Sequence, residues 1–146
     1  MDLILWRHAE AKDGTPDEKR ALTSRGQKQA KSMAEWLKPR LAPDVTIMVS
    51  PAVRAQQTAN ALTKHYLTVP ELGVDASVKS ILAATLWPDE DRMVVVVGHQ
   101  PTLGRVAAYL MSGKEADWNI KKGAIWWFRT RSGTTDLRAY LTPDLL

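Results

Sequence analysis

The fold class follows from one segment, Met93-Val94-Val95-Val96-Val97-Gly98-His99-Gln100-Pro101-Thr102. A run of valines bounded by polar residues is typical of a central strand that is covered on both faces. The residues after Gly98 predict a turn into a helix, which Gly113 ends. The apolar stripe of that helix is expected at Leu103, Val106, Ala107, Leu110 and Met111. The segment therefore predicts one strand-turn-helix unit of an α/β protein.

The same order of strand and helix occurs twice upstream. Leu3 to Trp6 is a short apolar run, and a helix is expected from Ser24, which has capping-box spacing to Gln27, up to Pro39. Val45 to Val49 is rich in β-formers, and Ser50-Pro51 is suited to cap and start a helix. The buried stripes of the two helices are expected at Ala30, Met33, Ala34 and Leu37, and at Ala55, Ala59, Leu62 and Tyr66.

The remaining segments complete the sheet and its helices. Leu67 to Leu72 predicts a short edge strand, because it contains Pro70, and Val78 to Leu86 has helical spacing. Ala124 to Phe128, a turn near Gly133 and an alternating run to Leu141 predict a hairpin. We expect a three-layer α/β sandwich over residues 1–146, with a mainly parallel central sheet between helices and late antiparallel strands.

Composition restricts the class of protein. The chain has 146 residues, 45% of them apolar and 25% charged, which predicts one globular domain and excludes disorder. A net charge of +4 favours anionic partners, and the absence of cysteine excludes disulfides and thiolate chemistry. Asp2 and the short first apolar run do not resemble a signal peptide, and no run approaches the length of a membrane span. The expected location is the cytoplasm.

Polar side chains follow each of the three strands at its carboxyl end. These are Arg7-His8, then Ser50 with Arg54, and then His99. Parallel strands end at one edge of the sheet, where ligands bind and the next helices begin. Imidazole and guanidinium groups beside helix N-termini favour a phosphoryl group, and no carboxylate cluster there points to a metal. The pattern predicts a metal-independent phosphoryl-transfer centre with an imidazole nucleophile, although an Arg-His pair alone can simply mark where a strand reaches water.

Motifs at these positions resemble those of the histidine phosphatase superfamily, with its phosphoglycerate-mutase-like fold, and most closely the small SixA-type phosphohistidine phosphatases. The matching residues are Arg7-His8, Leu22-Thr23-x-x-Gly26, Ser50-Pro51-x-x-Arg54-Ala55-x-Gln57-Thr58 and Gly98-His99-Gln100-Pro101-Thr102. The resemblance implies that His8 is a nucleophile that forms a phosphohistidine intermediate, without metal or cofactor. It also implies that Arg7, Arg54 and His99 hold the phosphoryl oxygens, with Ser50 and Gln100 as further candidates.

Two features depart from the family pattern. Ala9 replaces the glycine that follows the Arg-His pair, which is tolerable if its φ is negative. No motif fixes the acid that protonates a leaving oxygen; Glu71 is the candidate, and Asp75 and Glu10 are alternatives. A leaving imidazole needs less help from an acid than an alkoxide does, so the missing acid favours an N–P substrate.

The expected function is a phosphatase, monomeric or weakly dimeric, that acts on phosphohistidine in signalling or phosphotransfer proteins. The alternatives are a phosphatase of small phosphomonoesters and a non-catalytic phosphoprotein-binding module on the same fold. A nucleic-acid-binding domain and a metal site around His8, Glu10 and His99 are less well supported, since the six tryptophans fit core packing and the spacing fits no common ligand motif. Lys121-Lys122 is expected to be solvated, with docking of an acidic partner as the alternative.

Overall fold

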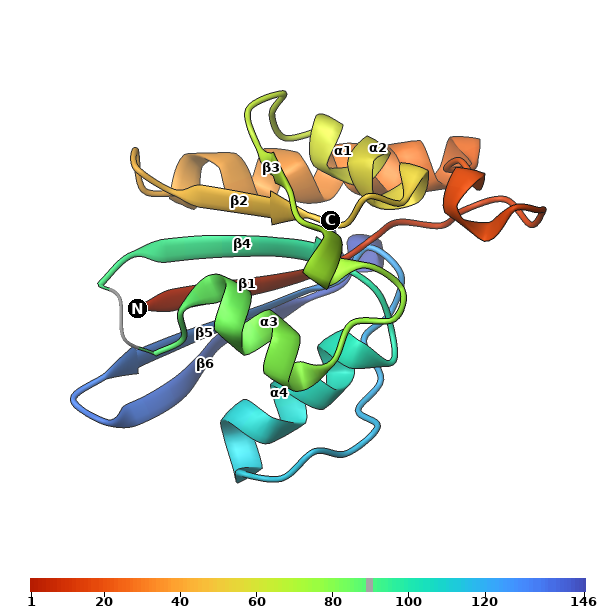
Figure 1. The fold of residues 1–146 in the computed structure, drawn as a ribbon. Coiled ribbons are helices and arrows are strands. Elements are labelled where there is room, and N and C mark those ends of the chain that lie inside the picture. Colours follow the sequence, from red (N-terminus) through yellow and green to blue (C-terminus); the bar gives the residue numbers. More distant parts are fainter. Residues whose placement is uncertain (89–90) are drawn as a thin grey trace.

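The computed structural model describes residues 1–88 and 91–146, in which one mixed sheet lies between two pairs of helices (Figure 1). The strand order is β3-β2-β4-β1-β5-β6. The pairs β3/β2, β2/β4 and β4/β1 are parallel, whereas β5 pairs antiparallel with β1 and with β6. The predicted three-layer α/β sandwich with a late antiparallel hairpin is therefore confirmed.

The elements alternate along the chain as the hydrophobic pattern indicates. The strands are β1 (Asp2–Arg7), β2 (Thr46–Val49), β3 (Leu67–Thr68), β4 (Met93–Gly98), β5 (Ile125–Arg131) and β6 (Thr134–Leu141). The α-helices are α1 (Ser24–Leu37), α2 (Val53–Asn60), α3 (Val78–Thr85) and α4 (Thr102–Ser112). Short 3-10 turns cover Asp17–Lys19, Lys38–Arg40, Pro70–Leu72 and Pro143–Leu145.

Strand alternation divides the core into two layers. On β1, Leu3 and Leu5 pack toward α3 and α4, whereas Ile4 and Trp6 pack toward α1 and α2. The valines of β4 divide in the same way, and all four are fully buried. Because β1 and β4 are covered on both faces, a shift of either strand along the other would move apolar side chains out of the core. Their continuous apolar runs therefore fix the register and the position at which each strand ends.

The starts of two helices differ from the sequence-based expectation. Thr23, not Ser24, caps α1, because its hydroxyl accepts a hydrogen bond from the backbone of Gly26. Ser50 does not cap α2, whose N-cap is Ala52, and the helix ends at Asn60. The Ser50 hydroxyl instead contacts the backbone of Ala52 and the ring of His99. Leu62 and Tyr66 therefore lie beyond the helix that was expected to contain them.

The strand expected from Leu67 to Leu72 covers only Leu67–Thr68, because Pro70 begins a 3-10 turn, whereas the predicted end of the α4 helix and the turn near Gly133 agree with the structure. Gly113 ends α4 in the left-handed conformation, with φ of 78°. Met111 in the last turn of α4 is exposed rather than part of the buried stripe. Ser132 and Gly133 both have positive φ, as the tight turn between β5 and β6 requires. Among the described residues, no helix combines the length and the apolar character needed to cross a bilayer.

Candidate active site

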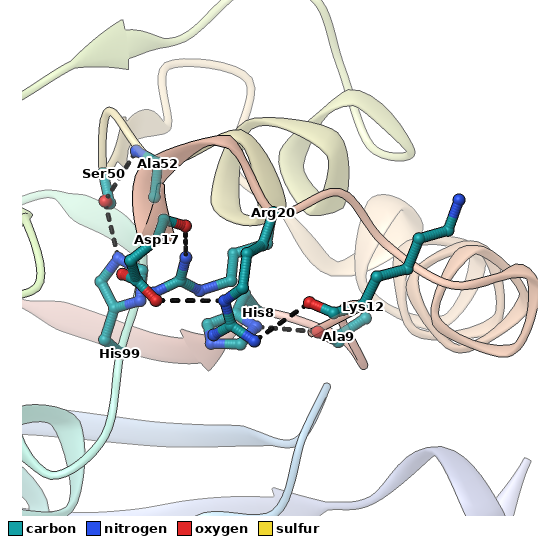
Figure 2. Close-up of polar contacts among 9 residues, drawn as sticks. His8, Ala9, Lys12, Asp17, Arg20, Ser50, Ala52 and His99 are labelled. Atoms are coloured by element: carbon teal, nitrogen blue, oxygen red, sulfur yellow. Dashed lines mark hydrogen bonds and ion pairs between the residues drawn. The ribbon is translucent and has the colours of Figure 1, made fainter. Parts of the chain in front are cut away.

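Two histidines meet because two neighbouring strands are parallel and in register. Arg7 at the end of β1 pairs with Gly98 at the end of β4, and the amide of His8 donates to the carbonyl oxygen of Gly98 at 3.0 Å. The next residue of each strand is a histidine. The ring centroids of His8 and His99 are 5.2 Å apart, and Figure 2 shows the two side chains on the same edge of the sheet.

The third strand brings a hydroxyl and a guanidinium to this edge. Ser50 follows β2, and its amide donates to the carbonyl oxygen of Val97 on β4 at 3.0 Å. Arg54 lies in the first turn of α2 and is only 4% exposed. The guanidinium of Arg54 is buried at the N-terminal end of a helix, where the helix dipole disfavours cations. This placement indicates that an anionic group binds Arg54.

His8, His99 and Arg54 border one small cavity, which we call the His8 cavity, whereas Ser50 lines the cavity next to it. The volume of the His8 cavity is about 240 Å³. It is lined by Arg7, His8, Ala11, Asp13, Asp17, Arg20, Arg54, Val74, His99, Gln100 and Lys122. The four residues on which the sequence-based hypothesis depends, Arg7, His8, Arg54 and His99, are all among them. The cavity is thus polar and cationic, as a site for a phosphoryl group requires.

The ring of His8 has one nitrogen fixed and the other available. Its Nδ1 lies 2.8 Å from the carbonyl oxygen of Ala9, which only accepts, so Nδ1 carries the proton. Nε2 therefore holds a lone pair. Burial lowers the pKa of His8 to about 3, and the charges of His99, Arg54 and Arg7 add to this effect. The ring is neutral at pH 7, which is the state that a nucleophilic or basic imidazole needs.

His99 is oriented by the buried hydroxyl of Ser50. The hydroxyl oxygen accepts from the amide of Ala52 at 3.2 Å and lies 2.7 Å from Nε2 of His99. The other contact of this hydroxyl is a backbone donor, which favours the ring tautomer in which Nε2 accepts the hydroxyl proton and Nδ1 carries the ring proton. Burial, followed by the charge of Arg54, lowers the pKa of His99 to about 4. His99 is therefore a neutral hydrogen-bond donor.

Three buried nitrogens at the cavity have no hydrogen-bond partner within the described part of the chain. They are Nε of Arg7, Nε of Arg54 and Nδ1 of His99. Buried donors are normally satisfied, because leaving one unpaired costs about 1–3 kcal/mol. Three such nitrogens belong to residues that line one cavity with His8, which is consistent with a site for an oxyanion with several acceptor oxygens.

A loop that sequence reasoning did not single out supplies an aspartate to the site. The Asp17 backbone carbonyl accepts from one terminal nitrogen of Arg54 at 2.8 Å, and its carboxylate accepts from the other at 3.0 Å. The same carboxylate binds Arg20, as Figure 2 shows. Hydrogen bonding to Arg54 is the main cause of the lowered pKa of Asp17. The D-x-x-R spacing of Asp17 and Arg20 was the available signal in the sequence.

The candidates for a general acid lie elsewhere. Glu71 is exposed and lines a neighbouring cavity with Asp75 and Glu18, and none of the three borders the His8 cavity. Glu10 accepts a hydrogen bond from the hydroxyl of Thr23. The carboxylates that do line the His8 cavity are Asp13 and Asp17. The structure therefore does not bring Glu71 to the histidines.

Several motif residues act on the backbone rather than on the cavity. The Thr58 hydroxyl accepts from the amide of Ala9 at 3.0 Å, and the Gln57 side chain accepts from the amide of Leu22 at 2.7 Å. A Cβ on Gly26 would lie 2.0 Å from the carbonyl oxygen of Glu10, so glycine is required there. These contacts hold the loop after His8 against α1 and α2.

Gln100 and Ala9 also have clear structural environments. Gln100 lines the cavity, but its amide donates to the carbonyl of Trp118 and accepts from the amide of Gly104. Ala9 is fully buried beside Leu22. It is not among the non-glycine residues with positive φ in the described chain, so its methyl group causes no backbone strain.

The arrangement of these side chains defines a class of site. A neutral imidazole with a free nitrogen faces a cavity bordered by three guanidiniums and a second neutral imidazole. Such a site can bind a tetrahedral oxyanion and attack it. Within residues 1–88 and 91–146, no group of three His, Asp or Glu side chains is placed to hold a metal ion.

Comparisons with known proteins agree with this class. The model of the histidine phosphatase superfamily (branch 1) matches residues 3–75. Phosphohistidine phosphatase SixA of Escherichia coli K12 is 30% identical over 123 residues, which cover 78% of this chain and 76% of SixA. The structure of the protein histidine phosphatase SixA complexed with tungstate superposes with a TM-score of 0.85 at 27% identity, covering 99% of both chains.

A more distant structure shares the fold. It is a phosphoserine phosphatase mutant from Entamoeba histolytica in complex with phosphoserine, with a TM-score of 0.75, 18% identity and coverage of 99% of this chain and 98% of that one. The chain belongs to the histidine phosphatase superfamily, and its similarity to SixA places it among the SixA-type members. Membership and homology together support phosphatase activity.

Proposed function

We propose that the protein is a phosphohistidine phosphatase that uses His8 as its nucleophile. The observation that carries this proposal is the free Nε2 of His8 in a cavity lined by Arg7, Arg54 and His99, each of which has a buried nitrogen without a partner among the described residues. The proposal extends to the substrate, which would be a phosphohistidine side chain of a signalling or phosphotransfer protein.

The reaction proceeds in two displacements. The lone pair of His8 Nε2 attacks phosphorus, the bond from phosphorus to the substrate imidazole breaks, and that imidazole leaves with a proton from solvent. A water molecule then attacks the phosphoryl group on His8, the Nε2–P bond breaks, and phosphate leaves with the protons of the water. Arg7, Arg54 and His99 Nδ1–H donate to the three phosphoryl oxygens in both steps.

The arrangement of carboxyl groups favours a nitrogen leaving group. An alkoxide needs a proton from a positioned acid, whereas an imidazole leaves readily once its ring is protonated by solvent. Asp17 is held as a carboxylate by Arg54 and Arg20, and Glu71 does not border the cavity. This supports the N–P substrate over a phosphomonoester.

The second candidate is a phosphatase of small phosphomonoesters. Asp13 favours it, because this exposed carboxyl group also lines the His8 cavity and would be the proton donor. The substrates that distinguish the two candidates are free phosphohistidine and phosphoserine.

The test compares both substrates and traps the intermediate. We expect a higher kcat/KM on phosphohistidine than on phosphoserine, and a labelled phosphoenzyme that is absent in His8→Ala, whose rate falls at least about a thousandfold. Equal or faster hydrolysis of phosphoserine, abolished by Asp13→Asn, would establish the second candidate. Binding of phosphohistidine without turnover would instead identify a non-catalytic binding module.

A further inference from the structure

A second, larger concave surface adjoins the His8 cavity, and we call it the basic groove. Its volume is about 700 Å³. Five cationic residues line it: Arg7, Arg25, Lys28, Lys121 and Lys122. Glu10 and Asp144 are the acidic residues of its lining. Arg7 and Lys122 line both the groove and the His8 cavity, so the two sites are adjacent.

One wall of the groove is a face of α1. Arg25, Lys28, Gln29 and Ser32 have the i, i+3, i+4, i+7 spacing of residues on one side of a helix. No acidic residue lies in the first turn of α1. Arg25 and Lys28 therefore lie near the positive end of the helix dipole, which destabilises the free protein slightly and is relieved when an anion binds.

The opposite wall is a turn that the strand bearing His8 holds in place. The amide of Gly123 donates to the carbonyl oxygen of His8 at 3.0 Å, and the Arg7 guanidinium donates to the carbonyl oxygen of Ile120 at 2.8 Å. Lys121 and Lys122 lie between these two anchors. Their backbone positions are thus fixed relative to the reacting imidazole, although their side chains are exposed.

These cations are not neutralised by the protein itself. Among the residues that the structure describes, none of the five forms an ion pair within 4.0 Å. The carboxylate of Glu10 accepts from the Thr23 hydroxyl, and Asp144 has a pKa lowered chiefly by a hydrogen bond from Thr142, with a small contribution from Lys121. The groove therefore presents an excess of positive charge to solvent.

We infer that the basic groove binds an acidic segment of the partner protein next to its phosphorylated side chain. This inference rests on the proposed function, because it places the phosphoryl group in the His8 cavity and the flanking carboxylates in the adjoining groove. A single-stranded nucleic acid fits less well, since the lining contains no aromatic side chain on which a base could stack. The groove thus confers substrate specificity by charge, at a distance from the reacting atoms.

The experiment uses two synthetic peptides of equal length that carry one phosphohistidine, flanked in one by Glu and Asp and in the other by Ser and Gln. For the unaltered protein at low salt we expect kcat/KM to be about tenfold higher on the acidic peptide, and the difference to shrink as salt screens the charges. Free phosphohistidine is the reference substrate, with no flanking charge.

The double variant Lys28→Glu/Lys121→Glu alters one residue of each wall and should lose the preference while hydrolysing free phosphohistidine at the original rate. The matched control is Lys64→Glu/Lys114→Glu, which makes the same change of charge at exposed residues outside the groove and should keep the preference. The variant Lys28→Gln/Lys121→Gln removes the two charges without reversing them, and it repeats the test if the charge-reversed variant does not fold.

Direct binding separates failure of the groove from failure of the proposed function. Fluorescence anisotropy with the unphosphorylated acidic peptide should show binding that the groove variant weakens about tenfold, whether or not phosphohistidine is hydrolysed. Equal kcat/KM on both peptides, equal losses in the groove and control variants, or tighter binding of a single-stranded oligonucleotide than of the acidic peptide would each overturn the inference.

Discussion

The hydroxyl oxygen of Ser50 lies 2.7 Å from Nε2 of His99, and both residues are buried. Its other contact is the amide of Ala52, which only donates, so Nε2 of His99 is the acceptor within reach of the hydroxyl proton among the described residues. We therefore predict that Ser50 is a positioning residue, which favours the tautomer of His99 with the proton on Nδ1, the nitrogen that has no partner within the described chain.

Replacing Ser50 with alanine is expected to slow the reaction without removing any group that touches phosphate. Ser50→Ala leaves Nε2 of His99 unpaired, so both tautomers become populated, and kcat/KM should fall about tenfold. Removing the donor altogether in His99→Ala should cost more, about 10² to 10³-fold. The ¹⁵N chemical shifts of the His99 ring report the tautomer. Unchanged shifts in Ser50→Ala would contradict the positioning role.

Arg54→Lys is expected to be a damaging substitution despite conserving charge. The guanidinium donates to both the backbone and the carboxylate of Asp17 and retains a further donor at the cavity. An ammonium group cannot reproduce this planar set of donors. We expect kcat/KM to fall about 10² to 10³-fold with an unchanged circular dichroism spectrum. A loss smaller than about threefold would show that only the charge matters.

The buried histidines should make the protein less stable in mild acid. The pKa values of His8 and His99 are about 3 and about 4 in the folded state, below the ordinary value of 6.5. Between pH 6.5 and 4 the unfolded chain therefore binds more protons, and stability falls by about 1.4 kcal/mol per pH unit for each ring.

A variant that cannot titrate at position 8 provides the measurement. Urea unfolding of His8→Gln at pH 7 and pH 5 should show a loss of stability about 2 kcal/mol smaller than that of the unaltered protein. Equal losses in the two proteins would mean that His8 titrates normally in the folded state.

Gly26→Ala should disturb the loop that follows His8. The added methyl group would lie 2.0 Å from the carbonyl oxygen of Glu10, so helix and loop must separate. We expect a loss of about 1–3 kcal/mol in the free energy of unfolding, together with reduced kcat. The control is Gly98→Ala, whose methyl group meets Leu103 at an ordinary 3.5 Å. If both variants were equally stable, close approach at Gly26 would not explain the motif.

The sequence predicted those parts of the fold and site that depend on regular elements. Continuous apolar runs identified β1 and β4, and their parallel register places Arg7, His8 and His99 where the pattern predicted. The roles of these residues in catalysis stay predictions. The alternating pattern near the C-terminus likewise identified the hairpin of β5 and β6.

What the sequence did not predict depends on side-chain contacts over long distances along the chain. Ser50 was expected to cap a helix, but its hydroxyl forms a hydrogen bond with the ring of His99, which lies 49 residues further along the chain. Asp17 meets Arg54 across 37 residues, and its loop carries no periodic pattern that would reveal this contact. Glu71 was selected by its place in the chain, which does not determine which cavity a turn faces.

The hydrogen bond from the backbone amide of His8 to the carbonyl oxygen of Gly98 has a consequence for how the protein unfolds. This amide belongs to the centre of the sheet, whereas Asp17 is exposed on a short turn. In hydrogen–deuterium exchange, the amide of His8 should exchange only when the whole molecule unfolds, and the amides around Asp17 should exchange through local fluctuations. Heating is then expected to release the aspartate from the guanidinium long before the two imidazoles separate.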